Sequence, residues 1–186
     1  MVGLSGLWMP ILLSAVSVFI ASSLIHMVLG WHAAENPAPP NQEALGDAMR
    51  PFNLAPGDYS MPRAASMKDM GTPEFIAKMT KGPVVMMTVM PNGPINMGRS
   101  LGLWFVYCVV ISVFAAYVTG RTNGMGAEYL SVFRVAGTVA FAAYALGTWQ
   151  NWIWWGKSMR ATLTATLDGL IYALLTAGLF GWLWPR

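Results

Sequence analysis

The chain has 186 residues, of which 55% are hydrophobic and 10% are charged, and its formal net charge is +3. Ordinary soluble domains carry roughly 25% charged residues, so this composition is typical of a protein with lipid-facing helices. The basic residues are scattered, whereas a nucleic-acid-binding surface needs a dense Lys/Arg face, so no nucleic-acid partner is expected. The single cysteine, Cys108, excludes an internal disulfide and a cysteine-rich structural zinc site.

Four long apolar stretches cover residues 7–30, 98–120, 128–148 and 161–184. Each has about the 20 residues that a helix needs to cross roughly 30 Å of hydrocarbon. We therefore expect an α-helical integral membrane protein, built as a four-span transmembrane helical bundle. A small α/β extramembrane cap is expected between spans 1 and 2.

The expected cap, residues 32–97, contains signals for two short helices. Asn41 is a favourable N-cap residue, and the helix that it starts is predicted to continue to about Arg50. A second helix is predicted to start at Thr72, because a proline and a glutamate follow this capping residue, and to end at Gly82.

A strand is predicted after the second helix, over the largely apolar residues 83–90, with residues 58–61 as a candidate partner. These elements favour a compact α/β cap over a disordered linker. The chain then divides into a first span over 1–31, the cap, and a three-span region over 98–186.

The distribution of basic residues predicts the orientation. With four spans, both termini lie on one side of the membrane, and the cap and the 156–160 loop lie on the other. Most Lys and Arg residues fall on the loop side, so the positive-inside rule predicts that the cap and this loop are cytoplasmic and the termini external. The small size and the absence of a basic signal-peptide start suggest a bacterial inner membrane.

The fourth stretch carries a row of small residues at a spacing of four. Such rows form a groove in which two helix backbones approach closely, either inside the bundle or between copies of the chain. Internal packing is the favoured interpretation, and self-association is the alternative. The row consists of Ala161, Ala165, Gly169, Ala173, Ala177 and Gly181.

Two charged residues, Arg134 and Asp168, lie inside the third and fourth apolar stretches. Charges in this setting are unfavourable and often functional, so an ion or proton pathway is one interpretation. In the alternative, Arg134 extends to the membrane interface and Asp168 contacts a neighbouring helix or the Trp-rich loop. The second interpretation is favoured, because no other acid accompanies Asp168 within the spans.

His26 and His32 lie at the loop-side end of the first stretch and are weak candidates for metal ligands. Six residues apart, they would face different sides of a continuous helix, unless the helix ends between them at Gly30. Methionines are abundant on the same side, and thioethers with imidazole would suit copper(I). Methionine also fills apolar gaps, so this interpretation is not favoured, and no cofactor is assigned.

An aromatic segment, residues 149–155, contains four tryptophans and is best explained as a membrane-interface belt, with a quinone-like pocket as the alternative. The sequence contains no His-Glu-x-x-His, no Gly-x-Ser-x-Gly and no phosphate-binding glycine-rich loop, so an enzyme is not expected.

Three functions remain as hypotheses. The first is a non-catalytic multi-pass membrane component, self-associating or an accessory subunit of a larger complex, whose partners are lipids and membrane proteins. The second is a small homo-oligomeric channel or transporter with Asp168 or Arg134 near the pathway. The third is a copper- or quinone-handling membrane protein.

Overall fold

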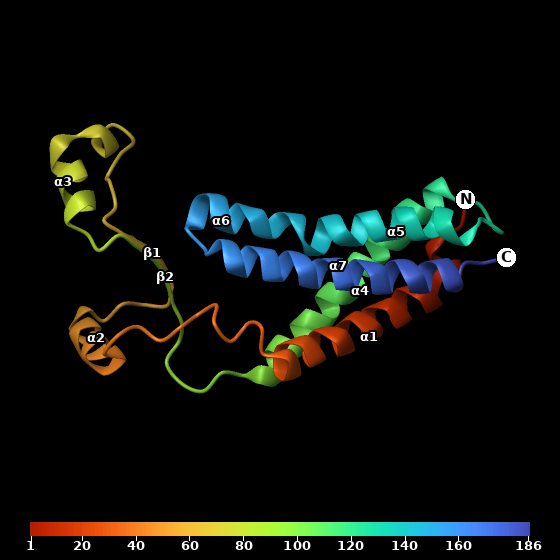
Figure 1. Cartoon of the computed structure of the whole chain (residues 1–186), viewed down its shortest axis with the longest axis horizontal. Coiled ribbons are helices and arrows are strands. Elements are labelled where there is room, and N and C mark those ends of the chain that lie inside the picture. Colours follow the sequence, from red (N-terminus) through yellow and green to blue (C-terminus); the bar gives the residue numbers. More distant parts are fainter. The chain divides into compact units, whose positions relative to one another are not determined.

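The computed structural model describes all 186 residues and divides into two units (Figure 1). The helical unit comprises Met1–Pro37 and Asn96–Arg186, and the inserted unit comprises Ala38–Ile95. Four helices in the helical unit are long and apolar enough to cross a membrane, which confirms the prediction of a helical, multi-pass chain and is consistent with an integral membrane protein. They are Leu4–Leu29, Met97–Thr122, Tyr129–Trp155 and Met159–Trp182.

The first of these helices changes its winding at both ends. It consists of η1 (Leu4–Leu7), α1 (Trp8–Leu24) and η2 (Ile25–Leu29), a π-helical turn. The helix ends at Gly30, whose φ of +61° is in the left-handed region that glycine adopts without a steric penalty.

The second and fourth helices begin with side-chain caps. Asn96 Oδ1 accepts a hydrogen bond of 3.0 Å from Arg99 N at the start of α4 (Met97–Thr122). Ser158 Oγ accepts one of 3.1 Å from Ala161 N at the start of α7 (Met159–Trp182). These caps satisfy backbone N–H groups that would otherwise lack a partner at the helix start.

The third helix is interrupted near its loop-side end. It runs as α5 (Tyr129–Tyr144), a 3₁₀ turn η5 (Leu146–Thr148) and α6 (Trp149–Trp155). The Thr148 hydroxyl donates to Ala145 O at 2.6 Å, which satisfies a carbonyl at the interruption. Residues 149–155, expected as an interfacial belt, are therefore helical, and several of their indoles are exposed.

The four long helices pack in a closed ring, in which α1 contacts α4 and α7, and α5 also contacts α4 and α7. Apolar side chains fill two layers of the interior, one around Tyr144 and Tyr172 and the other around Phe180. The chain termini lie at the same end of this unit (Figure 1).

The small-residue row of α7 lies largely against α5. A Cβ added to Gly169 would lie 2.8 Å from the Ala145 Cβ, and one added to Gly137 would lie 3.0 Å from the Ala177 Cβ. Ala173 and Ala177 are buried. Residues of the row therefore take part in packing within the chain.

The inserted unit contains two short helices and a two-stranded antiparallel sheet. The helices are α2 (Gln42–Met49) and α3 (Pro73–Lys81), and the strands are β1 (Gly57–Met61) and β2 (Val85–Val89). Two 3₁₀ turns, η3 (Arg50–Phe52) and η4 (Asp69–Gly71), adjoin the helices. In the register of the sheet, Gly57 faces Val89 and Met61 faces Val85.

Both predicted helix starts in this unit are confirmed. Asn41 Oδ1 accepts from Ala44 N at 3.4 Å, and Thr72 Oγ1 accepts from Phe75 N at 3.3 Å. Gly82, with φ +61°, ends α3 as expected.

The inserted unit forms a compact cluster of contacts of its own, but it has no buried core. No residue of the inserted unit is buried, because neither helix packs on the sheet: β1 packs with β2, and α2 and α3 pack with their adjacent 3₁₀ turns. Residues 32–37 belong to the helical unit.

Candidate functional site

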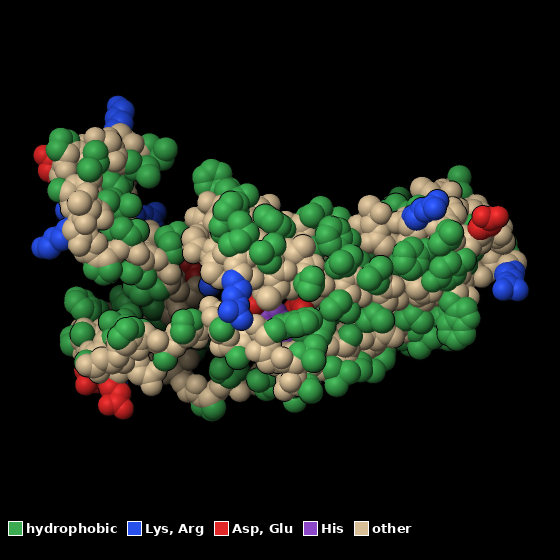
Figure 2. Space-filling view, in the orientation of Figure 1, with side chains coloured by type: hydrophobic (Ala, Val, Ile, Leu, Met, Phe, Trp, Pro, Cys, Tyr) green, Lys and Arg blue, Asp and Glu red, His purple; other side chains and the backbone are tan.

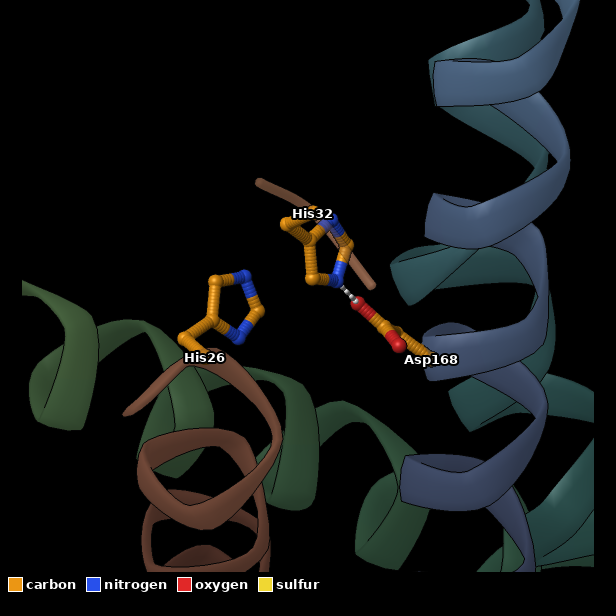
Figure 3. Close-up of side chains that lie close together, drawn as sticks. All are labelled: His26, His32 and Asp168. Carbon is orange, nitrogen blue, oxygen red and sulfur yellow. Dashed lines mark ion pairs between the residues drawn. The ribbon is translucent and has the colours of Figure 1, made fainter. Parts of the chain in front are cut away.

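Three side chains that are distant in the sequence meet near the loop-side end of the helical unit (Figure 3). They are His26 from η2, His32 from the segment after it, and Asp168 from α7. One ligand atom from each, a ring nitrogen or a carboxylate oxygen, lies within 4.8 Å of the other two. His26 is exposed, His32 is half-buried and Asp168 is buried.

The left-handed turn at Gly30 brings the two histidines together. After this residue the chain folds back in two successive turns, with Ala33 N donating to Gly30 O and Glu35 N donating to His32 O, both at 3.0 Å. The two imidazole rings stack with their centroids 4.4 Å apart and their planes 14° from parallel. The sequence alone could not decide whether the helix ends between the two histidines. In the structure it does end there, at Gly30.

Each imidazole is oriented by a hydrogen bond through its Nδ1 atom. His26 Nδ1 lies 3.0 Å from Ser22 O, and His32 Nδ1 lies 2.8 Å from Glu35 Oε1. A carbonyl oxygen and an ionised carboxylate only accept hydrogen bonds, so Nδ1 carries the proton in both rings. In the neutral imidazole, each Nε2 then has a free lone pair.

Asp168 is only 4% exposed, and its carboxylate does not have all the hydrogen-bond partners that it can accept. Its Oδ2 lies 2.8 Å from His32 Nε2. The angles of this contact do not fit a hydrogen bond, so Nε2 has no hydrogen-bond partner. Its Oδ1 is buried and has no hydrogen-bond donor. A buried carboxylate in such surroundings is unfavourable unless a cation or donors compensate it.

Glu35 connects the segment after η2 to α7. Its carboxylate accepts hydrogen bonds from the Thr164 hydroxyl and from His32. Burial raises the pKa of Glu35, but these hydrogen bonds and the nearby imidazoles lower it more, so the pKa lies below its ordinary value of 4.5. Sequence reasoning missed Glu35, although its position three residues after His32 was an available signal.

The second charged candidate, Arg134, is not part of this site. It is exposed on α5, and no ion pair involves it. Asp168 therefore meets His32 and not Arg134, and the pair on which an intramembrane pathway was considered is not formed.

Aromatic side chains surround the inner side of the site. The ring centroids of Tyr144 and Tyr172 are 5.3 Å apart, and Trp104 lies 6.3 Å and 6.1 Å from them. The indole of Trp104 donates to Ser22 Oγ at 2.7 Å, which joins α4 to α1 beside His26. These rings form an aromatic wall, in which the hydroxyls of Tyr144 and Tyr172 are buried without a hydrogen-bond partner.

Of the methionines, Met27 is next to His26 in the sequence, and its side chain is 83% exposed. A shallow cavity of about 220 Å³ adjoins Glu35 and is lined also by Thr148, Asn151 and Lys157.

Comparisons of the chain with protein-family models, curated proteins and solved structures found no match.

Proposed function

We propose that the protein is a non-catalytic component of a membrane protein assembly, and that its inserted unit packs on another protein subunit. The observation that carries this proposal is the absence of any buried residue in Ala38–Ile95. Defined helices and a hairpin occur here without a core of their own. We place the protein in a bacterial inner membrane, with the inserted unit and the 156–160 loop cytoplasmic and the termini external.

An uncovered surface of this kind is unfavourable in water. An isolated two-stranded hairpin is at best marginally stable, and contiguous exposed apolar surface is typical of interaction sites. Figure 2 shows apolar side chains at the surface around α2 and α3, whose places Figure 1 gives. The large apolar side chains exposed in this unit include Leu45, Phe52, Met67, Met70, Ile76, Met79, Met86 and Met90.

Helix α3 presents these side chains on one face. Phe75, Ile76 and Met79 fall within about 100° of each other on a helix of 3.6 residues per turn, and Lys81 lies on the opposite side, with Lys78 at the border of the apolar face. An amphipathic helix whose apolar face is not covered by its own chain fits an apolar groove on a partner.

The helical unit offers a less obvious surface for assembly. The small-residue row of α7, the groove considered for self-association, is largely used by α5. The inserted unit is therefore the surface that most needs a partner.

The test is native mass spectrometry of the protein gently extracted from its own membrane, with Ile76→Lys and Ala77→Lys as matched variants. Both positions are exposed on α3, but Ala77 lies about 150° from the centre of the apolar face. We expect the unmodified protein and Ala77→Lys to co-purify with a partner at a fixed ratio, and Ile76→Lys to lose that partner.

A homo-oligomeric mass that Ile76→Lys dissociates would identify the partner as a second copy of the chain. A monomer in both the unmodified protein and the variants would contradict the proposal.

A further inference from the structure

We propose that His26, His32 and Asp168 form a binding site for a divalent transition-metal ion, with Zn²⁺ the best match to the donor set. This inference concerns the helical unit and is independent of the partner proposed for the inserted unit. Figure 3 shows the two imidazoles and the carboxylate that converge on the site.

The carboxylate of Asp168 supplies the first argument. It is buried at 4% exposure, it makes no ion pair with Lys or Arg, and its Oδ1 has no donor. A charged group in this position needs a positive partner. A metal ion beside both imidazoles would provide the missing charge and occupy carboxylate lone pairs that are otherwise unused.

The two imidazoles supply the second argument. In metal sites, a histidine ligand commonly donates its other ring N–H to a carbonyl or carboxylate, which fixes the ring and increases its basicity. Both forms of this arrangement are present, with Ser22 O behind His26 and the Glu35 carboxylate behind His32. Each Nε2 is left as a free donor for a metal ion.

A simple ion pair between His32 and Asp168 explains less of this geometry. The contact of 2.8 Å between Nε2 and Oδ2 is not aligned as a hydrogen bond, and it gives no role to His26. The ion pair would need only His32 to be protonated, and it would leave the ring of His26, stacked on that ring at 4.4 Å, without a part in the site. A shared metal ion would instead use both rings.

The donor set selects the class of metal. Two imidazoles and one carboxylate suit zinc and its neighbours, whereas calcium and magnesium prefer all-oxygen sites and copper(I) prefers sulfur ligands. Zinc bonds of about 2.0–2.1 Å put tetrahedral ligand atoms about 3.3 Å apart. In the structure the three ligand atoms lie within 4.8 Å of one another. To reach the shorter zinc-bound distances, the side chains must rotate slightly inward, which the exposed His26 can do.

Three protein ligands leave one position of a tetrahedral ion for water or another small ligand. The bound ion would also join the segment after η2 to α7, since His32 lies on the first and Asp168 on the second. Glu35 would act as a positioning residue, because it contacts the ring of His32 from behind.

The test uses the full-length protein in detergent, purified through a tag that contains no histidine, stripped of metal and titrated with Zn²⁺ and Co²⁺. We expect one ion per chain, and a Co²⁺ complex with the intense visible absorption of tetrahedral coordination. His26→Gln, His32→Gln and Asp168→Asn should each weaken binding by more than Glu35→Gln, for which a loss of about tenfold is expected.

Two controls separate the site from general effects. Asp69→Asn removes an acid of the inserted unit and should leave the metal affinity unchanged. Because His26 is exposed, His26→Gln should keep the thermal stability of the unmodified metal-free protein, so its loss of binding would not reflect unfolding. No measurable binding, or equal affinity in the unmodified protein, His26→Gln and Asp168→Asn, would overturn the proposal.

Discussion

Gly169 on α7 lies directly against Ala145, at the point where α5 gives way to η5. A Cβ at Gly169 would lie 2.8 Å from the Ala145 Cβ and 3.1 Å from its backbone nitrogen. The neighbour is largely backbone, which cannot move aside as a flexible side chain can. The close approach of α5 and α7 therefore depends on this glycine.

We expect Gly169→Ala to lower the free energy of unfolding by about 1–3 kcal/mol, the usual range for overpacking. Thermal melting in detergent, followed by circular dichroism, measures the effect. Gly102→Ala is the matched control, because a Cβ at this α4 position has no neighbour within 4 Å. Similar melting temperatures for Gly169→Ala and the unmodified protein would show that α5 and α7 are not so closely packed.

We expect Trp104→Phe to lower the free energy of unfolding by about 1 kcal/mol, because the hydrogen bond from the indole to Ser22 Oγ is lost and a hydroxyl is left without its donor. The same melting experiment applies. Trp154→Phe, at an indole that is 76% exposed, should have little effect. An equal loss in both variants would contradict a specific role for the Trp104 hydrogen bond.

We expect Arg134→Leu to leave the melting temperature unchanged or to raise it, because Arg134 is exposed on an apolar helix and has no ion pair. The comparison is with Val132→Ala, at a fully buried position of the same helix, which should lower the melting temperature. A marked loss of stability in Arg134→Leu would indicate a contact of Arg134 that the structure does not contain.

We expect Thr72→Ala to weaken α3 by about 1 kcal/mol, because its Oγ1 accepts from Phe75 N at the helix start. Hydrogen exchange of the amides in Pro73–Lys81 measures this local effect. Thr80→Ala is the control, since its hydroxyl donates only to Ile76 O within the helix. If both variants exchange at the same rate, the cap does not limit opening of this helix.

Features encoded over short stretches of sequence could be predicted. The length and apolarity of the spans gave their number, and the capping residues Asn41 and Thr72, with the stop at Gly82, gave the two helices of the inserted unit. Each of these signals acts through backbone groups within a few residues, so no knowledge of distant packing is needed.

Features that depend on distant contacts could not be predicted in the same way. The meeting of His32 with Asp168 requires both the turn after Gly30 and the packing of α1 beside α7. The only local signal for the interruption of the third span near Ala145 is Gly147, and an isolated glycine within a helical pattern is often tolerated. The missing core of the inserted unit was hidden because helix and strand signals do not report whether the elements pack together.

Both ends of the chain are fastened by hydrogen bonds to the end of α4 and to the connection between α4 and α5. Val2 N donates to Gly120 O at 2.8 Å, Trp184 Nε1 donates to Gly124 O at 2.8 Å, and Gly126 N donates to Pro185 O at 2.8 Å. If the four helices span a membrane, a membrane-impermeant label directed at either terminus or at Met125, which is 68% exposed in this connection, would therefore report on the same aqueous compartment. One labelling experiment on intact cells fixes the sidedness of every other loop.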